Sequence, residues 1–278
     1  MAVGKFSEKK LTAQVLHRIR NTRNRRLKQV MTGFIRHLHA FVREVKPTQK
    51  EWDKGIGFLI ETGKWCSDRR NEFILLSDTQ GVSMLVDAIN YKAGGGATES
   101  TVLGPFHRMN APQYPLGANI SKHASDGVPC LVSGTVRDAR GRPIAGAKLD
   151  VWQGGADGLY DSQKGEAMNL RGVFRADARG RFHFRCVRPE FYPVPHDGPA
   201  GKLLTATGRH PMRPPHLHFW ITAKGYKPLI THLFVKGGKY LDSDAVFGVK
   251  PELIVDFKKS KGGVATATYD FVLMKEKK

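Results

Sequence analysis

The segment RPPHLHFWITA, residues 213 to 223, carries two histidines whose spacing suits a shared metal ion. Successive side chains of a β-strand point to opposite faces, so His216 and His218 would share one face and the apolar residues between them the other. Neutral imidazoles at positions i and i+2 can bind one cation without strain. The residues alone leave open a second interpretation, in which the histidines are a hydrogen-bonded pair in a protein core.

The same half of the chain carries two tyrosines in conspicuous sequence contexts. Tyr160 lies in GGADGLYDSQ and Tyr192 in RPEFYPVPHDGP, both in loop-like surroundings. Either residue could equally serve packing alone, because the ring is apolar and the hydroxyl needs only one partner. The acids nearest in sequence, Glu190 and Asp197, lie in turn-like segments and do not establish a site of two histidines and one carboxylate.

The composition is that of a globular protein of 278 residues, long enough to bury a large core. No run of about 18 apolar residues occurs, so we expect no membrane span. The N-terminal MAVGKFSEKK lacks the apolar core of a secretory signal, and we therefore expect a cytoplasmic protein. The three cysteines lack metal-binding spacing and are predicted to be reduced thiols: Cys66, Cys130 and Cys186.

The net charge of +20 is concentrated near the N-terminus, where residues 1–50 hold thirteen Lys or Arg against two acids. Such a basic arm is typical of nucleic-acid or anionic-surface binding, and an acid-poor start is also similar to a transit peptide. No nucleic-acid-binding motif accompanies it, so we expect a solvated helix face and no nucleic-acid partner.

The two halves of the chain have different periods. Apolar residues over 27–45 recur at spacings of three and four and predict an amphipathic helix that Pro47 ends. Thr48 and Glu51 form a capping-box pattern that begins a second helix, and a third is expected over 81–91.

After TVLGPF, turn residues occur about every ten positions, and short alternating segments such as RFHFRCV lie between them. No helix-length segments separate these strands, so the pattern favours a sandwich over βαβ units. The predicted fold class is α+β: a helical domain with a basic arm over 1–105, packed on an antiparallel β-sandwich over 106–278, which would be the catalytic domain.

Three segments of the sandwich resemble the intradiol ring-cleavage dioxygenases, and most of all their hydroxyquinol 1,2-dioxygenase branch: LRGVFRADARGRFHFRCVRPEFYPVPHDGP, GRHPMRPPHLHFWITAKGY and ITHLFVKGGKYLDSDAVFGVK. The helical segments FILLSDTQGVSMLVDAIN and GATESTVLGPF are similar to that branch too. The resemblance implies a non-haem Fe(III) with four protein ligands: Tyr160, Tyr192, His216 and His218. It also implies a homodimer joined through a dimerisation-type helical domain, with a lipid at the interface in some members.

This ligand set has a chemical rationale. Anionic oxygen donors stabilise Fe(III) over Fe(II), and a bound cation lowers a tyrosine pKa from its usual value of about 10. The resemblance implies that Tyr192 leaves the metal as substrate binds while Tyr160 stays. It further implies that Arg213 stabilises negative charge on the aromatic ring.

The resemblance also implies a substrate pocket of six further positions: Met84, Asp87, Val102, Leu103, Gly104 and His232. Met84 and Asp87 are three residues apart on one helix and so share a face. His232 stands where catechol-cleaving relatives carry Gln, and His107 and Arg108 stand where they carry Tyr and Val. Asp87 is our candidate acceptor for the third hydroxyl of hydroxyquinol.

The predicted reaction is cleavage of hydroxyquinol (1,2,4-trihydroxybenzene) by O2 to 3-hydroxy-cis,cis-muconate, whose keto form is maleylacetate. One alternative is a different aromatic diol, catechol or a chlorocatechol. A second alternative is a sandwich that binds nucleic acid through its basic arm, with purely structural histidines. Colour distinguishes the classes, because tyrosinate on Fe(III) absorbs visible light and a binding module does not.

Overall fold

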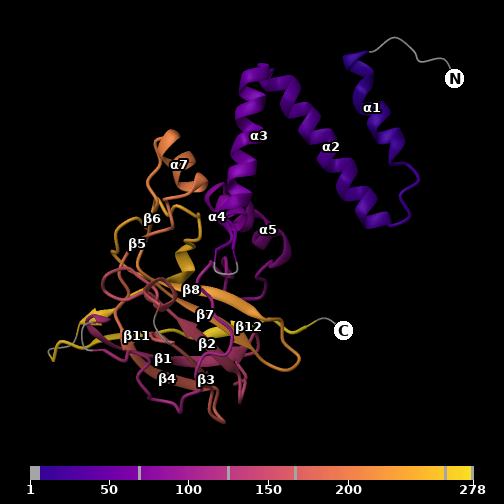
Figure 1. Ribbon diagram of the computed structural model, residues 1–278. Helices are drawn as coiled ribbons and strands as arrows, with labels where there is room; N and C mark the ends of the chain where they lie inside the picture. Colours follow the sequence, from indigo (N-terminus) through magenta and orange to yellow (C-terminus); the bar gives the residue numbers. More distant parts are fainter. Residues whose placement is uncertain (1–6, 68–69, 124–125, 166–167, 260–261, 277–278) are drawn as a thin grey trace. The chain divides into compact units, whose positions relative to one another are not determined.

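The computed structural model describes residues 7–67, 70–123, 126–165, 168–259 and 262–276, and Figure 1 shows its elements in chain order. Residues group into two compact units, 1–60 and 61–278. This division lies upstream of the predicted domain boundary at residue 105, which therefore stays a prediction. No helix among the described residues combines the length and apolar content needed to cross a lipid bilayer.

The first unit holds α1 (Glu8–Arg18), α2 (Arg25–Val45) and most of α3 (Gln49–Lys64). The Asn24 side chain caps α2 by accepting from the Leu27 amide at 2.9 Å, and the helix ends where Lys46 turns left-handed at φ 50°. The predicted capping box is confirmed, because the Thr48 amide donates to the Glu51 carboxylate at 2.8 Å and the Glu51 amide donates to the Thr48 hydroxyl at 3.3 Å.

The helices of the first unit bury little of their apolar surface within one chain. Phe34 is 58% exposed and Phe41 56% exposed, although both lie on the predicted apolar stripe of α2. Ile35 is the residue of α2 that is buried. Periodicity predicted this helix correctly, but most of its apolar stripe is exposed in the described chain.

The second unit contains a sandwich of two five-stranded sheets. The first sheet is built around β1 (Pro129–Asp138), which pairs with β4 (Arg181–Val187), β11 (Ala265–Thr268) and β12 (Phe271–Leu273), while β10 (Lys258–Lys259) pairs with β11. The second has the order β3 (Arg171–Arg175), β2 (Lys148–Trp152), β7 (His216–Thr222), β8 (Leu229–Val235) and β9 (Ile254–Val255). The long ladders are antiparallel as predicted; β1 also pairs in parallel with β11 and β12, and β8 with β9.

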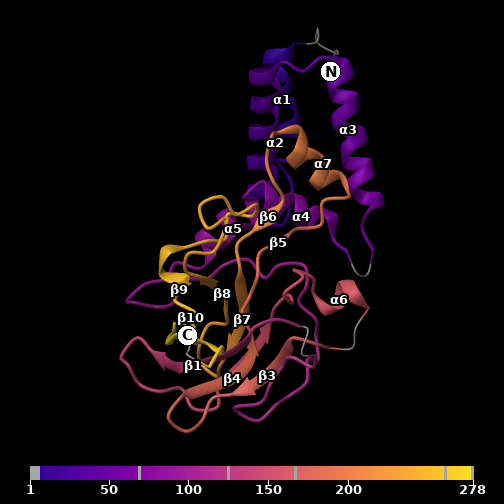
Figure 2. The same ribbon diagram turned by 90° about the vertical axis from the view of Figure 1, so that its left-hand side faces the viewer.

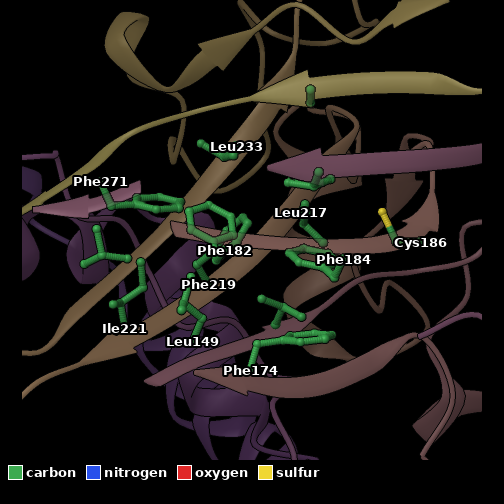
Figure 3. Close-up of a cluster of buried hydrophobic side chains, with 14 of the residues drawn as sticks. Leu149, Phe174, Phe182, Phe184, Cys186, Leu217, Phe219, Ile221, Leu233 and Phe271 are labelled. Atoms are coloured by element: carbon green, nitrogen blue, oxygen red, sulfur yellow. The ribbon is translucent and has the colours of Figure 1, made fainter. Parts of the chain in front are cut away.

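Aromatic side chains from both sheets fill the space between them. Figure 3 shows Phe182 and Phe184 of the first sheet beside Phe219 of the second, and all three are fully buried. Phe219 lies with its ring centroid 4.8 Å from that of Phe271 on β12. Such burial of large apolar side chains is the main favourable contribution to the stability of a sandwich.

Shorter elements of the second unit precede the strands of these two sheets or lie between them in the chain. They are α4 (Glu72–Thr79), α5 (Val82–Asn90), α6 (Asp161–Lys164), β5 (Tyr192–Pro193), α7 (Pro199–Ala206), β6 (Met212–Arg213) and a 3-10 turn (Pro251–Leu253). Figure 2 shows the β5–β6 pair between the sandwich and α7. The buried Glu72 carboxylate accepts from the Ala200 amide at 3.0 Å and so joins α4 to the start of α7.

Candidate metal centre and substrate pocket

β7 carries the two histidines on one face and the apolar core on the other, as its alternation predicts. Leu217, Phe219 and Ile221 belong to the core cluster between the sheets. His216 and His218 point away from that core, and both are buried. Since β7 pairs with β2 on one side and β8 on the other, its backbone is held along its length.

Four polar atoms from three parts of the sequence meet at this face. The Tyr160 hydroxyl lies 2.8 Å from His218 Nε2 and donates to the Tyr192 hydroxyl at 3.1 Å. Tyr192 Oη lies 3.4 Å from His216 Nε2, and the two Nε2 atoms lie 3.1 Å apart. All four side chains are buried. Two phenol oxygens and two imidazole nitrogens therefore form one compact donor set.

Short local structures aim the two tyrosines. Tyr160 is the residue before α6, and its amide donates to the Gln163 side chain at 2.9 Å. The Phe106 ring stacks on it with centroids 4.4 Å apart. Tyr192 lies in β5, opposite Arg213 of β6. Gly158 turns left-handed at φ 73° beside it, where an added Cβ would lie 2.9 Å from that of Tyr192.

The two histidines are oriented by different means. His216 Nδ1 donates to the Pro214 carbonyl at 2.7 Å, so its Nε2 keeps a lone pair, which accepts from Arg213 Nη1 at 3.1 Å. His218 stacks instead on Trp152, with centroids 4.7 Å apart and planes 16° apart. Gly104 lies against the His218 edge, because a Cβ added there would be 3.3 Å from His218 Cε1.

The protonation states follow from burial. Desolvation lowers the pKa of His216 well below 6.5, and the charge of Arg213 lowers it further. Desolvation likewise lowers the pKa of His218. Burial raises the pKa of Tyr160 well above 10 and also raises the pKa of Tyr192. The imidazoles are thus neutral and ready to bind a cation, whereas the phenols hold protons that a cation must displace.

Arg213 reaches the donor set although strand parity does not place it there. Its guanidinium is buried and pairs with Asp244, from Nε at 3.0 Å and from Nη2 at 3.2 Å. The third nitrogen is the one that contacts His216. Asp244, which also accepts from the Gly248 amide at 2.9 Å, was missed by sequence reasoning, because nothing local marks it in the run YLDSDAVFG.

Three of the predicted apolar pocket residues lie in or against buried clusters, and their part in a pocket stays a prediction. Met84 of α5 and Val102 belong to one buried cluster, and Leu103 packs against the cluster of Phe106, Trp152, Tyr160 and Tyr192. A pocket of about 380 Å³ opens nearby, with Leu75, Phe106, Leu159 and Val194 among its lining residues. Phe106, which stacks on Tyr160, and Trp152, which stacks on His218, had no sequence signal beyond their aromatic type.

Asp87 already has polar partners. Its carboxylate accepts from the Ser100 hydroxyl at 2.8 Å and lies 3.5 Å from Lys250 Nζ, which pairs with Glu99 at 2.9 Å. His232 of β8 lies directly opposite His218 of β7. The part assigned to each in substrate binding stays a prediction.

Other polar residues singled out in the sequence pair elsewhere. Glu190 pairs with Arg188 and Asp197 with Arg70, each at 2.8 Å. His107 lies 3.3 Å from the Asp150 carboxylate, and Arg108 pairs with Asp161 at 3.0 Å. The buried Asp161 also binds Arg171, so this network fixes the start of α6 directly after Tyr160.

Comparison with known sequences agrees with this geometry. Residues 102–275 match the family described as Dioxygenase, and residues 24–98 match Catechol dioxygenase N terminus. A 6-chlorohydroxyquinol 1,2-dioxygenase of Cupriavidus pinatubonensis is 51% identical over 270 residues, which cover 96% of this chain and 98% of that protein. A hydroxyquinol 1,2-dioxygenase of a Rhizobium species is 49% identical, with 92% and 88% covered.

Solved structures share the fold. A hydroxyquinol 1,2-dioxygenase from Pseudomonas putida superposes with a TM-score of 0.90 at 46% identity, covering 97% of this chain and 99% of that one. A 3-chlorocatechol 1,2-dioxygenase from Rhodococcus opacus does so with 0.78 at 30% identity, covering 90% and 99%. The chain belongs to the intradiol ring-cleavage dioxygenase family. This membership favours the enzyme over the nucleic-acid-binding module.

Proposed function

We propose that the protein is a non-haem Fe(III) dioxygenase that cleaves hydroxyquinol with O2 to 3-hydroxy-cis,cis-muconate and its keto form maleylacetate. The observation that carries the proposal is the buried set of two tyrosine oxygens and two histidine nitrogens within 3.4 Å of their neighbours. The names of several relatives at 46–51% identity support the substrate.

The residues fit a ferric ion. Tyr160, Tyr192, His216 and His218 would hold it, because phenolates are hard anionic donors and His216 already presents a lone pair on Nε2. The bound ion would supply a strong Lewis acid that an aromatic diol can chelate and that makes the ring reactive towards O2.

Two side chains of the protein, Tyr192 and Arg213, would then bind the released proton and stabilise the developing charge. Burial favours the phenol form of Tyr192, so a proton released by the incoming diol can be held on Tyr192 Oη. Arg213, fixed by Asp244 and adjacent to His216, provides a permanent positive charge at a buried position. Negative charge that develops on the ring is stabilised by this guanidinium, which need not reorient during the reaction.

The apolar wall formed by Met84, Val102, Leu103 and Gly104 would bind the faces of the aromatic ring, while Asp87 and His232 supply polar atoms at its edge. A catechol or chlorocatechol is the alternative substrate, and the similarity to a 3-chlorocatechol 1,2-dioxygenase structure favours testing it.

We extend the proposal to assembly and location. A homodimer joined through the first unit would cover its exposed apolar side chains, and a lipid could occupy the same interface. Three free cysteines, of which Cys130 and Cys186 lie directly opposite each other on β1 and β4, are consistent with the reducing cytoplasm.

The test is metal analysis with a visible spectrum of the purified protein, before and after hydroxyquinol is added without oxygen. We expect one iron per chain, a visible tyrosinate band that shifts on addition, and ring cleavage when oxygen is admitted. A colourless protein, or one that holds zinc, contradicts the metal assignment. Preference for catechol over hydroxyquinol contradicts the substrate assignment alone.

A further inference from the structure

A third histidine shares the buried face of the donor set. His232 lies opposite His218 across the β7–β8 ladder and is fully buried. Its ring centroid is 4.2 Å from that of His218 and 4.7 Å from that of His216. One nitrogen from each of the three rings lies within 4.8 Å of the others. His232 thus faces the space that the metal and substrate would share.

The neighbours of His232 determine which nitrogen carries its proton. Nδ1 lies 2.9 Å from the Thr101 hydroxyl, which itself donates to the Val102 carbonyl at 3.4 Å. A hydroxyl whose proton is directed to a carbonyl acts as an acceptor towards the ring, so it favours a proton on Nδ1. Nε2 then keeps its lone pair.

His232 Nε2 has no hydrogen-bond partner among the described residues, although it is buried. Buried polar atoms nearly always have one, so this acceptor needs a donor that arrives from outside the chain. The Asp87 carboxylate differs, since Ser100 and Lys250 already lie against it. Of the two polar groups assigned to the pocket, His232 is therefore the one with free capacity to accept.

We propose that Thr101 and His232 form a hydroxyl-recognition pair, in which His232 Nε2 accepts a hydrogen bond from a hydroxyl of the aromatic substrate and Thr101 holds the tautomer that makes this possible. The proposal rests on the proposed function of the site and deepens it. Thr101 acts through His232 and is a positioning residue. Because the two diol oxygens would chelate the metal, the third hydroxyl of a triol is the donor that this acceptor recognises.

The experiment measures binding of hydroxyquinol and catechol without oxygen, by titrating the visible band of the iron-loaded full chain. His232→Leu should weaken hydroxyquinol roughly 10- to 100-fold and catechol much less, because only the triol loses its acceptor. Thr101→Val should produce a smaller change of about 3- to 10-fold in the same direction. His232→Gln, the residue that catechol-cleaving relatives carry here, retains an acceptor oxygen in a different position and should give a preference between those of the wild type and His232→Leu.

Two further variants test whether the effect is specific to Thr101 and His232. Thr231→Val, which removes a buried hydroxyl one residue away on β8 that donates to the Glu99 carbonyl at 2.7 Å, should leave the ratio of the two affinities unchanged. The double variant Thr101→Val with His232→Leu should be no worse than His232→Leu alone, since Thr101 acts only through the ring.

Three outcomes would overturn the proposal. Loss of iron in His232→Leu would make His232 a metal ligand instead. Equal loss of affinity for hydroxyquinol and catechol would show that this pair does not recognise the third hydroxyl. So would an unchanged ratio of the two affinities in both single variants. Failure of the proposed function would be seen earlier, as a wild-type protein that holds no iron or binds neither compound.

Discussion

The two faces of β7 share one backbone but have different roles. One face places Leu217, Phe219 and Ile221 in an apolar core, where any well-packed neighbour is acceptable. The other face places His216 and His218 in a buried polar cluster, where each atom needs a partner of the right kind at hydrogen-bond distance. The first face is defined by alternation along seven residues. The second also needs Tyr160 and Tyr192, which come from distant parts of the chain.

Because of this difference, we expect mutations on one face to reduce activity and mutations on the other to reduce stability. On the site face, His218→Ala should lower the rate of ring cleavage by more than about 1,000-fold, because loss of a residue behind a metal ligand already costs roughly 10- to 100-fold. Iron content per chain and kcat measure this effect. Comparing urea unfolding with that of the metal-free wild type provides the control, and full activity in this variant would show that His218 is no ligand.

On the core face, Phe219→Ala should reduce the free energy of unfolding by about 3–5 kcal/mol, because a large buried ring is replaced by a cavity. Urea denaturation measures the loss. The protein that remains folded should keep its iron and visible band, since the site is on the opposite side of the strand. Loss of iron at temperatures where the variant is still folded would mean that the two faces are coupled.

Asp244→Asn tests a residue behind the site. The amide cannot hold both guanidinium nitrogens as a carboxylate does, so Arg213 should lose its fixed position and kcat/KM should fall roughly 10- to 100-fold with iron retained. Asp270→Asn is the matched control, because Asp270 pairs with Arg137 at a site where both side chains are about 40% exposed. A similar fall in the control would remove Asp244 from the mechanism.

Trp220→Phe should have the smallest effect. Trp220 shares the face of the histidines but is only partly buried, and it contacts His107. We expect a loss of stability below about 1.5 kcal/mol and no change in iron content or kcat. Thermal unfolding and metal analysis check this, and a clear fall in kcat would extend the functional part of the face further along the strand.

A structural feature could be predicted from the sequence when the residues that determine it lie close together in the chain. The stripe of α2 and the capping box at Thr48 and Glu51 are set by residues within one or two turns, and both were predicted. The histidine pair on β7 was predicted for the same reason. By contrast, α1 and α4 carry weaker stripes, and the parallel pairing of β11 with β1 joins segments about 135 residues apart.

The same rule applies to the site. Its histidines and tyrosines stand out in the sequence as residue types that can bind a metal. Family resemblance then grouped the tyrosines with the histidines as one ligand set. Asp244 and Thr101 could not be found in this way, because an Asp or Thr is ordinary in a loop and its role depends on which side chain the fold brings beside it. Only the three-dimensional arrangement shows that one fixes Arg213 and the other contacts His232.

The hydrogen bonds that join Tyr160, Tyr192, His216 and His218 to one another would make binding of the proposed iron an exchange of protons for metal. Burial raises the pKa of both tyrosines, so each phenol keeps its proton until a metal replaces it. Protons and the proposed iron would therefore compete for the same oxygens. Acid should therefore release the metal from a chain that stays folded. The affinity for the metal should fall by up to about 100-fold for each unit that the pH is lowered, because two protons replace the metal. A chelator titration between pH 6 and 8, combined with circular dichroism, would separate this release from unfolding.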